Sequence, residues 1–217
     1  MTVLQNRQLF LLPNVSGHCK TRPRKLQTEG IQTMEILNIE TKRLKIRHLG
    51  LSDISDFYIY RSNPEVTKYQ GFDTMTKEQA EEFIKVNSTK RFGKAGEWIQ
   101  YGIENIETKQ LIGDCAIKLD QYDTRIAEIG ITISQHEQKK GFAKEVLLGI
   151  LTFLFDTIKI HRVVEIVDAE NVASINLLKS TGFRQEGHFI ENIFFKGKWG
   201  SEFQFAMLKR EWDNKKY

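Results

Sequence analysis

Cysteine and proline are scarce in this chain, whose 217 residues include only two cysteines and three prolines. Two cysteines, Cys19 and Cys115, are too few to form the disulfide framework of a small secreted protein. The histidines and cysteines do not recur at the spacing of metal ligands. The composition therefore excludes a disulfide-built domain and predicts no metal site. A reducing cytoplasm is the expected compartment.

Long apolar runs are also missing. No stretch approaches the roughly 20 consecutive apolar residues that a membrane-spanning helix needs. The apolar residues 9–12 are too few for the core of a secretion signal. We therefore expect no membrane partner. With 40% hydrophobic and 28% charged residues, the chain suits one globular domain that buries a full core.

The excess of basic residues is confined to the N-terminal segment. Residues 1–33 contain five basic residues and one acidic residue, which accounts for the whole net charge of +4 and leaves residues 34–217 neutral. A neutral body has no basic footprint, so a nucleic-acid partner is not expected. Glu29 and Gly30 fit purine-rich codons that resemble a ribosome-binding site ahead of Met34. We interpret residues 1–33 as a mis-assigned extension, or alternatively as a disordered basic arm that touches RNA.

Apolar periodicity predicts one mixed α/β domain over residues 34–217. The predicted strands are 42–49, 97–105, 111–119, 125–134, 163–167, 183–195 and 201–208. The predicted helices are 52–60, 76–90, a long amphipathic helix from Gly141 to about Phe155, and 171–181. The pattern shows no repeat, and we expect no second domain.

Residues 138–144, QKKGFAK, lie between the strand at 125–134 and the long amphipathic helix. Backbone N–H groups of such a turn and of the first helical turn converge on one point and can cradle an anion. Gly141 permits close approach of a phosphate, and Ala143 is small enough not to block it. Three lysines of the turn add positive charge: Lys139, Lys140 and Lys144. The alternative is an ordinary glycine-containing turn with solvated lysines.

The pattern Gln138-x-x-Gly141-x-Ala143 resembles the pyrophosphate loop of the GNAT acyl-CoA N-acyltransferases. Further matching segments are TKRLKIR at 41–47, NPEVTKY at 63–69, NVASINLLKSTGF at 171–183, EGH at 186–188 and GKW at 197–199. Together they resemble the RimJ/RimL branch, which acetylates protein N-termini and other primary amines. The resemblance covers about residues 40–213.

The resemblance implies a GNAT fold, with a central mixed, mostly antiparallel sheet flanked by helices. In that fold the strands before Gln138 and before Asn171 are parallel neighbours that separate and admit the pantetheine arm of acetyl-CoA. The backbone of residues 139–144, Phe142 included, would hold the diphosphate. Backbone N–H groups of Ile131, Thr132 and Ile133 would stabilise the oxyanion of the transition state.

Three side chains are candidates for the chemistry. Glu128 would act through water as general base for the amine, would hold the cationic amine, or would only pair across the strands. Asn171 would cap a helix and contact the coenzyme A arm. Ser174 would donate a proton to the coenzyme sulfur, or would serve only the capping turn. The tyrosine that many GNAT enzymes use as acid is replaced by Leu178.

The sequence thus predicts an N-acetyltransferase that moves the acetyl group of acetyl-CoA to a primary amine by direct attack in a ternary complex. The acceptor would be a protein N-terminus, a polyamine or a small-molecule amine, and a homodimer is left open. Gly130-Ile131-Thr132 and Gly200-Ser201-Glu202 depart from the RimJ/RimL pattern on the acceptor side. The resemblance therefore does not imply that this chain shares the ribosomal-protein substrate of the RimJ/RimL enzymes. The alternative is a catalytically idle acyl-CoA-binding module or ribosome-associated sensor.

Overall fold

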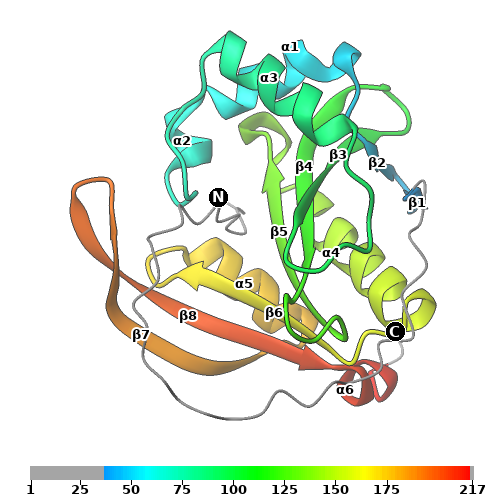
Figure 1. Ribbon diagram of the computed structural model, residues 1–217, viewed down its shortest axis with the longest axis vertical. Helices are drawn as coiled ribbons and strands as arrows, with labels where there is room; N and C mark the ends of the chain where they lie inside the picture. The colour runs from blue at the N-terminus through cyan, green and yellow to red at the C-terminus, as the bar shows by residue number, and fades with distance from the viewer. Residues whose placement is uncertain (1–36, 216–217) are drawn as a thin grey trace.

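One mixed sheet of eight strands runs through residues 37–215, the part of the chain that the computed structural model describes (Figure 1). Its order is β1-β2-β3-β4-β5-β6-β8-β7. The strands are β1 Ile39–Glu40, β2 Leu44–His48, β3 Trp98–Asn105, β4 Leu111–Leu119, β5 Ile126–Ile133, β6 Arg162–Asp168, β7 Arg184–Phe195 and β8 Lys198–Leu208. The extension or RNA-binding arm predicted for residues 1–33, and the start at Met34, lie outside the described residues.

Helices cover both faces of this sheet. They are α1 Ile54–Arg61, α2 Pro64–Thr67, α3 Lys77–Ser88, α4 Phe142–Thr152, α5 Val172–Thr181 and α6 Lys209–Asp213. A π-helical turn, Phe153–Thr157, extends α4. Thr76 and Gln79 form the capping box that begins α3. Pro64 ends the preceding helix as predicted, but it also starts α2, because proline fits the first helical position and Asn63 caps it.

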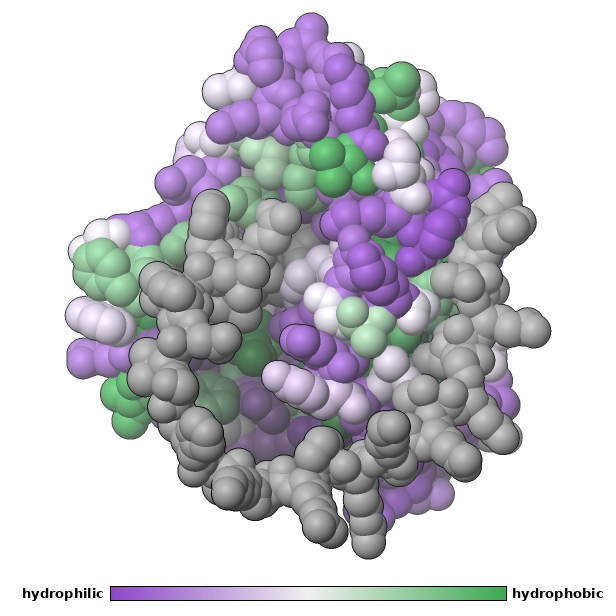
Figure 2. Space-filling view, viewed as in Figure 1, coloured by the Kyte–Doolittle hydropathy of each residue, from purple (hydrophilic) through white to green (hydrophobic). Residues whose placement is uncertain are grey.

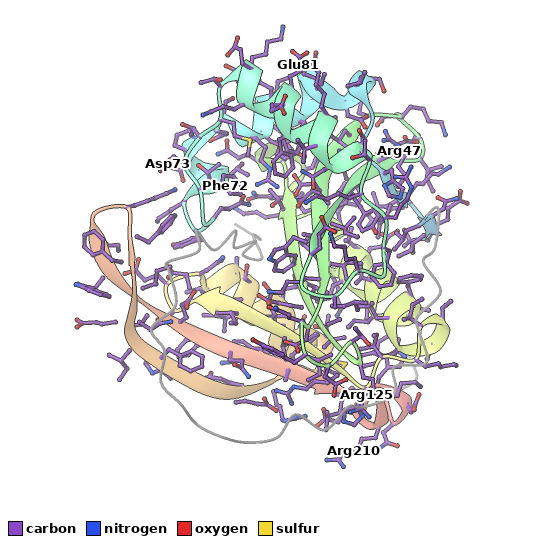
Figure 3. All side chains as sticks on the ribbon, viewed as in Figure 1. Arg47, Phe72, Asp73, Glu81, Arg125 and Arg210 are labelled. Carbon is purple, nitrogen blue, oxygen red and sulfur yellow. The ribbon has the colours of Figure 1, made fainter. Side chains whose placement is uncertain are left out.

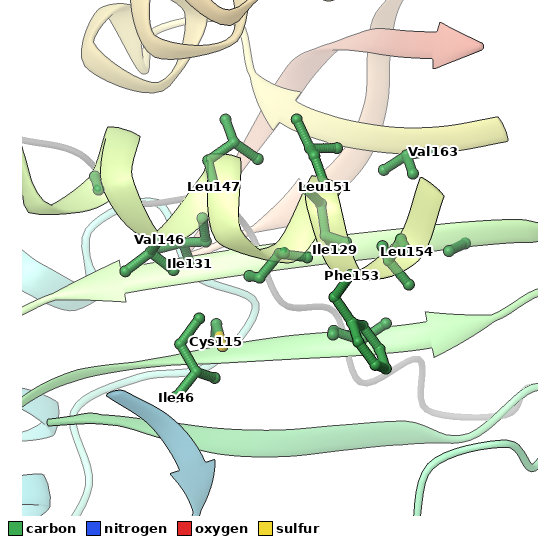
Figure 4. Packing of buried hydrophobic residues seen from close by; sticks show 14 of the residues in the cluster. Ile46, Cys115, Ile129, Ile131, Val146, Leu147, Leu151, Phe153, Leu154 and Val163 are labelled. Atoms are coloured by element: carbon green, nitrogen blue, oxygen red, sulfur yellow. The ribbon is translucent and has the colours of Figure 1, made fainter. Parts of the chain in front are cut away.

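The main core lies between the sheet and α4. Alternate residues of β5, Ile129, Ile131 and Ile133, are buried against the apolar stripe of α4 (Figure 4). Val146 and Leu147 of that stripe are fully buried. A smaller core under α1 and α3 packs on the opposite face. The two-residue alternation predicted for β5 is therefore confirmed, and Glu128, Gly130 and Thr132 point to the α1 and α3 side.

The parallel strands β5 and β6 separate partway along their length. Their pairing is limited to Ile126–Glu128 of β5 against Arg162–Val164 of β6. Beyond Glu128, β5 remains paired with β4 only, and its other edge opens toward the rest of β6. The splay implied by the family resemblance is thus present.

The β7–β8 hairpin extends from the sheet toward α2 (Figure 1). Its turn is Lys196–Gly197, with φ values of +50° and +79°. Two residues in the left-handed region form the turn that matches the twist of a tight hairpin. At the tip, Lys196 Nζ donates to the carbonyl of Thr67 at the end of α2, at 2.8 Å. This contact joins the hairpin to the helical side of the molecule.

Candidate active site

The predicted anion cradle lies between the end of β5 and the start of α4. Lys139 and Gly141 both have positive φ, +63° and +82°, so the chain reverses direction sharply before Phe142 begins the helix. Gln138 Nε2 donates to the carbonyl of Ile133 at 3.0 Å and fixes the loop to the strand. Lys140 Nζ pairs with Glu137 at 3.0 Å. The turn is therefore an ordered structure and places the first free N–H groups of α4 at its centre.

A cavity of about 260 Å³ opens at this turn. It is lined by Ile133, Glu137, Gln138, Lys139, Gly141, Phe142, Ala143, Lys144 and, from α5, Leu177. All the predicted loop residues except Lys140 are in this set. A cavity at a helix N-terminus, next to two lysines and a glycine that leaves the backbone bare, fits the diphosphate of coenzyme A. Diphosphate binding at this turn stays a prediction.

Two of the three predicted oxyanion donors face the gap between β5 and β6. Ser134 N–H bonds to the carbonyl of Ile112 on β4. Hydrogen bonding alternates along an antiparallel pair, so the Thr132 N–H points to β4 while those of Ile131 and Ile133 point the other way. The amides of Ile131 and Ile133 are therefore placed to meet a developing negative charge in the gap. The Thr132 backbone is not, because it belongs to the ladder with β4.

Glu128 lies at the last paired position before β5 and β6 separate. Its Oε2 atom is 2.5 Å from Nζ of Lys118, the residue directly opposite on β4. The same ammonium lies 4.6 Å from the centre of the Trp98 ring. The glutamate side chain is 18% exposed, so it remains within reach of the groove. The cross-strand pair is one of the alternatives left open by the sequence, and the general-base role stays a prediction.

Asn171 and Ser174 are buried at the start of α5, on the far side of the gap. Asn171 Oδ1 accepts from the Ser174 N–H at 3.2 Å, which is the predicted N-cap. Contacts of either side chain with coenzyme A stay predictions. Leu178, at the place of the usual tyrosine acid, is fully buried in the core.

A buried polar network that the sequence did not predict joins α1 to the open end of β5. Arg61 and Asp114, 0% and 1% exposed, form a bidentate pair with N–O distances of 2.5 and 2.9 Å. Tyr60 also donates to Asp114, at 2.7 Å, and its pKa is well above the ordinary value because the phenol is buried. Gln70 accepts from Arg61 and donates to Thr132 Oγ1 at 2.6 Å.

This network fixes the loop between α2 and α3. Phe72, two residues after Gln70, stacks on the Arg61 guanidinium at 4.6 Å. The loop, with Phe72 and Asp73, lies on the side of the hairpin tip (Figure 3), where Lys196 Nζ is 3.8 Å from Asp73. Phe72 lines a small hollow there, together with Met75, Phe83, Asn87, Lys90, Trp98 and Gln100. One signal was visible in the sequence: Asp114 is a charged residue in the middle of the mostly apolar β4.

Two further carboxylates lie on β6 and β8, of which Glu202 is only 1% exposed. Asp168 and Glu202 are directly opposite each other, and they share the sheet face that Glu128 occupies. Burial raises the pKa of Asp168 above its ordinary value. Phe194 and Trp199 are exposed apolar side chains of the hairpin. The hairpin lies at the left of the surface view (Figure 2). Within residues 37–215, no three His, Cys, Asp or Glu side chains meet as a metal site.

A glycine turn at a helix N-terminus, beside parallel strands that part, is the arrangement that the family resemblance predicts for an acyl-coenzyme A-dependent transferase. The family model described as Acetyltransferase (GNAT) domain matches residues 43–184. The chain therefore belongs to the GNAT acetyltransferases and is an acyl-CoA-dependent N-acetyltransferase. Membership in this family favours the enzyme over the catalytically idle module.

Curated relatives agree with this assignment. An uncharacterized N-acetyltransferase, p20, of Bacillus licheniformis is 32% identical over 79% of this chain and 96% of its own length. The spermidine N(1)-acetyltransferase of Vibrio cholerae is 26% identical over 80% of this chain and 97% of its own. The ribosomal protein uS5-alanine N-acetyltransferase of Escherichia coli is 25% identical over 56% and 63%. These relatives are consistent with the RimJ/RimL-like branch.

Solved structures share the fold. A GNAT-family acetyltransferase from Bacillus anthracis superposes with a TM-score of 0.72 at 26% identity, covering 81% of this chain and all of its own. The spermidine N-acetyltransferase of Vibrio cholerae in complex with CoA and spermine superposes with a TM-score of 0.67 at 23% identity, covering 80% and 100%. The predicted fold class is therefore confirmed.

Proposed function

We propose that the enzyme transfers the acetyl group of acetyl-CoA to a primary amine by direct attack within a ternary complex. The observation that supports this most is the cavity at residues 138–144 together with the amides of Ile131 and Ile133 on the open edge of β5. The cavity suits the diphosphate, and the amides lie farther along the gap, where a thioester carbonyl would lie. Binding and oxyanion stabilisation are then supplied by main-chain atoms.

In this reaction the amine nitrogen attacks the thioester carbonyl carbon, and its electron pair forms the new C–N bond. The carbonyl oxygen becomes an oxyanion facing the N–H groups of Ile131 and Ile133. When the carbonyl re-forms, the C–S bond breaks and coenzyme A leaves as thiolate. We assign to Ser174 the hydroxyl that relays a proton from water to the thiolate and is itself restored by that water, and to Glu128, through water, the proton that the amine loses. A thiol with a pKa near 8.5 leaves readily, so the acid need not be strong.

The proposed acceptor is a cationic primary amine: a polyamine, a protein N-terminus or another small-molecule amine. Glu128, Asp168 and Glu202 share the face of the sheet on which the groove lies, and carboxylates attract an ammonium before it loses its proton. Two relatives support the class, since one acetylates spermidine and another an alanine of a ribosomal protein.

A panel of amines tests this function. Purified enzyme with acetyl-CoA would be offered spermidine, an alanine-starting peptide and an aminoglycoside, and free thiol and acetylated product would both be measured. We expect product with at least one amine and none without enzyme. Tight binding of coenzyme A with no product from any amine would overturn the proposal in favour of a binding module.

Compartment and assembly belong to the same proposal. No helix in residues 37–215 is long and apolar enough to cross a membrane. We propose a cytoplasmic enzyme whose catalytic domain is residues 34–217, either alone or as a homodimer. Light scattering of the purified protein would distinguish monomer from dimer. The mass of the natively expressed protein would show whether it begins at Met34 or earlier.

A further inference from the structure

Arg43, at the start of the chain's described part, contacts the diphosphate loop almost one hundred residues away in the sequence. Its Nη1 donates to the carbonyl of Lys140 at 3.1 Å. Its guanidinium lies 4.4 Å from the centre of the Phe142 ring. A Cβ placed on Gly141 would lie 3.6 Å from its Nη2 atom. Arg43 thus packs along the whole bend, yet it does not line the cavity.

The position of Arg43 is itself fixed by Glu145 in the first turn of α4. Glu145 Oε2 accepts from Arg43 Nε at 2.7 Å, and Oε1 accepts from the Arg43 backbone N–H at 2.7 Å. Thr41 Oγ1 donates to the same Oε1 at 2.6 Å. Four hydrogen bonds therefore connect residues 41–43 with the loop and the helix behind it, counting the one to Lys140.

The hydrogen bond to Lys140 determines which way one amide of the loop points. In a planar trans peptide, the carbonyl of Lys140 and the N–H of Gly141 point to opposite sides. Because Arg43 holds the carbonyl on its side, the Gly141 N–H is directed away from Arg43. Gly141 lines the cavity and Arg43 does not, so we take the cavity to lie on the side to which this N–H points. Without Arg43, a peptide next to glycine can rotate, since glycine accepts both signs of φ.

We infer that Arg43 is a positioning residue for the donor, which turns the Gly141 amide toward the diphosphate of acetyl-CoA without touching the coenzyme. This inference rests on the proposed diphosphate site. Glu145 has two effects: it holds Arg43 in place, and it brings a negative charge close to the loop that Arg43 compensates. The contribution of Arg43 is then specific for donors that have a diphosphate.

Acetyl-pantetheine, which lacks the diphosphate, separates this role from a merely structural one. We expect Arg43→Gln to raise the KM for acetyl-CoA about tenfold, the loss typical of a hydrogen bond from a charged group. With acetyl-pantetheine, kcat/KM of Arg43→Gln should equal that of the wild type. Equal losses with both donors would overturn the inference. Lys42→Gln is the matched control, because it removes the same charge from an exposed neighbour.

Two further measurements make the result unambiguous. If wild-type enzyme does not prefer acetyl-CoA to acetyl-pantetheine, the diphosphate site itself is wrong; if it does and Arg43→Gln behaves as wild type, only the role of Arg43 is wrong. The double variant Arg43→Gln/Glu145→Gln tests orientation against charge. We expect it to stay weak toward acetyl-CoA, and recovery to wild-type KM would contradict the orienting role. Circular dichroism melts of each variant, with calorimetric coenzyme A binding, identify any that fails to fold.

Discussion

Glu128 and Lys118 lie opposite each other on β5 and β4, and their ion pair limits the roles that Glu128 can have in the reaction. In a resting pair the carboxylate is occupied, and a cationic amine entering the groove would compete with Lys118 for it. Glu128 can therefore hold the incoming ammonium, accept its proton through water, or serve only to join β5 to β4 through the ion pair with Lys118. Substitution distinguishes these roles, because they differ in their dependence on pH.

Glu128→Gln should lower kcat most at acid pH, by roughly 10²-fold if the carboxylate is the general base. The reason is that free amine is scarce there and must be generated in the site. The measurement is kcat from about pH 6 to about pH 9. Lys118→Gln is the control, because it breaks the pair and keeps the carboxylate. A loss independent of pH would leave Glu128 with only an electrostatic or structural role.

Thr132 connects the open edge of β5 to the acceptor side through Gln70. Thr132→Val keeps the shape and removes the hydroxyl that accepts from Gln70 Nε2. A buried donor without a partner costs about 1–3 kcal/mol, so urea unfolding should show a loss in that range. We expect the KM of the amine to rise because the loop with Phe72 loosens, while coenzyme A affinity is unchanged. Parallel loss of both would place Thr132 on the donor side.

At the scale of elements, the sequence pattern predicted the helices and strands that are long enough for the pattern to repeat. β4 begins and ends at the predicted residues, Thr76 caps α3, and α5 stops at Gly182. The elements that were missed have two to five residues: β1, α2 and α6. Such lengths are too short for a period to repeat, and partners distant in sequence stabilise them. β8 starts three residues earlier than predicted because its turn needs only two residues.

The same distinction between local and distant contacts separates the predicted from the unpredicted parts of the candidate site. The loop could be predicted because main-chain atoms form it, and glycine with flanking lysines marks it locally. The network could not, because Arg61 and Asp114 are 53 residues apart and meet only in the folded chain. Arg43 was part of a quoted motif, but nothing local shows that it reaches Lys140. Glu128 was placed on the correct face, while its partner Lys118 depends on the β4–β5 register.

The start of α5 allows the two proposed roles of Asn171 to be separated. Asn171→Ala removes the cap and should destabilise the protein by about 1 kcal/mol. Asn171→Asp keeps a carboxylate oxygen that caps equally well but has no amide N–H₂ to donate. If the amide also contacts coenzyme A, the aspartate variant will have wild-type unfolding free energy and weaker coenzyme binding by calorimetry. Wild-type binding in the aspartate variant would limit Asn171 to capping.

At the scale of the whole molecule, ion pairs between strands contribute stability that is lost in acid. Glu186 on β7 accepts from Arg162 on β6, and this hydrogen bond, with a further one from Arg184, lowers its pKa to about 2 although burial opposes the shift. A carboxylate with a lowered pKa in the folded state stabilises the fold above its ordinary value near 4.5. That contribution is lost as the pH falls from there toward 2.

Glu186→Gln should therefore reduce the difference in unfolding free energy between about pH 7 and about pH 3. The change should be about 1 kcal/mol or less, because the pair is partly exposed to solvent. Urea unfolding at both pH values measures it, and Glu191→Gln, an exposed glutamate on the same strand, is the control. An undiminished pH dependence would show that other carboxylates set the acid limit.

The account as a whole depends on main-chain amides at the start of α4 holding a diphosphate. The most direct measurement is calorimetric titration of wild type and Gly141→Val with coenzyme A and with pantetheine. A side chain at Gly141 is strained at φ +82° and covers the backbone. We expect wild type to bind coenzyme A far more tightly than pantetheine, and Gly141→Val to lose that preference while remaining folded. Wild-type coenzyme A affinity in the folded variant would contradict the account.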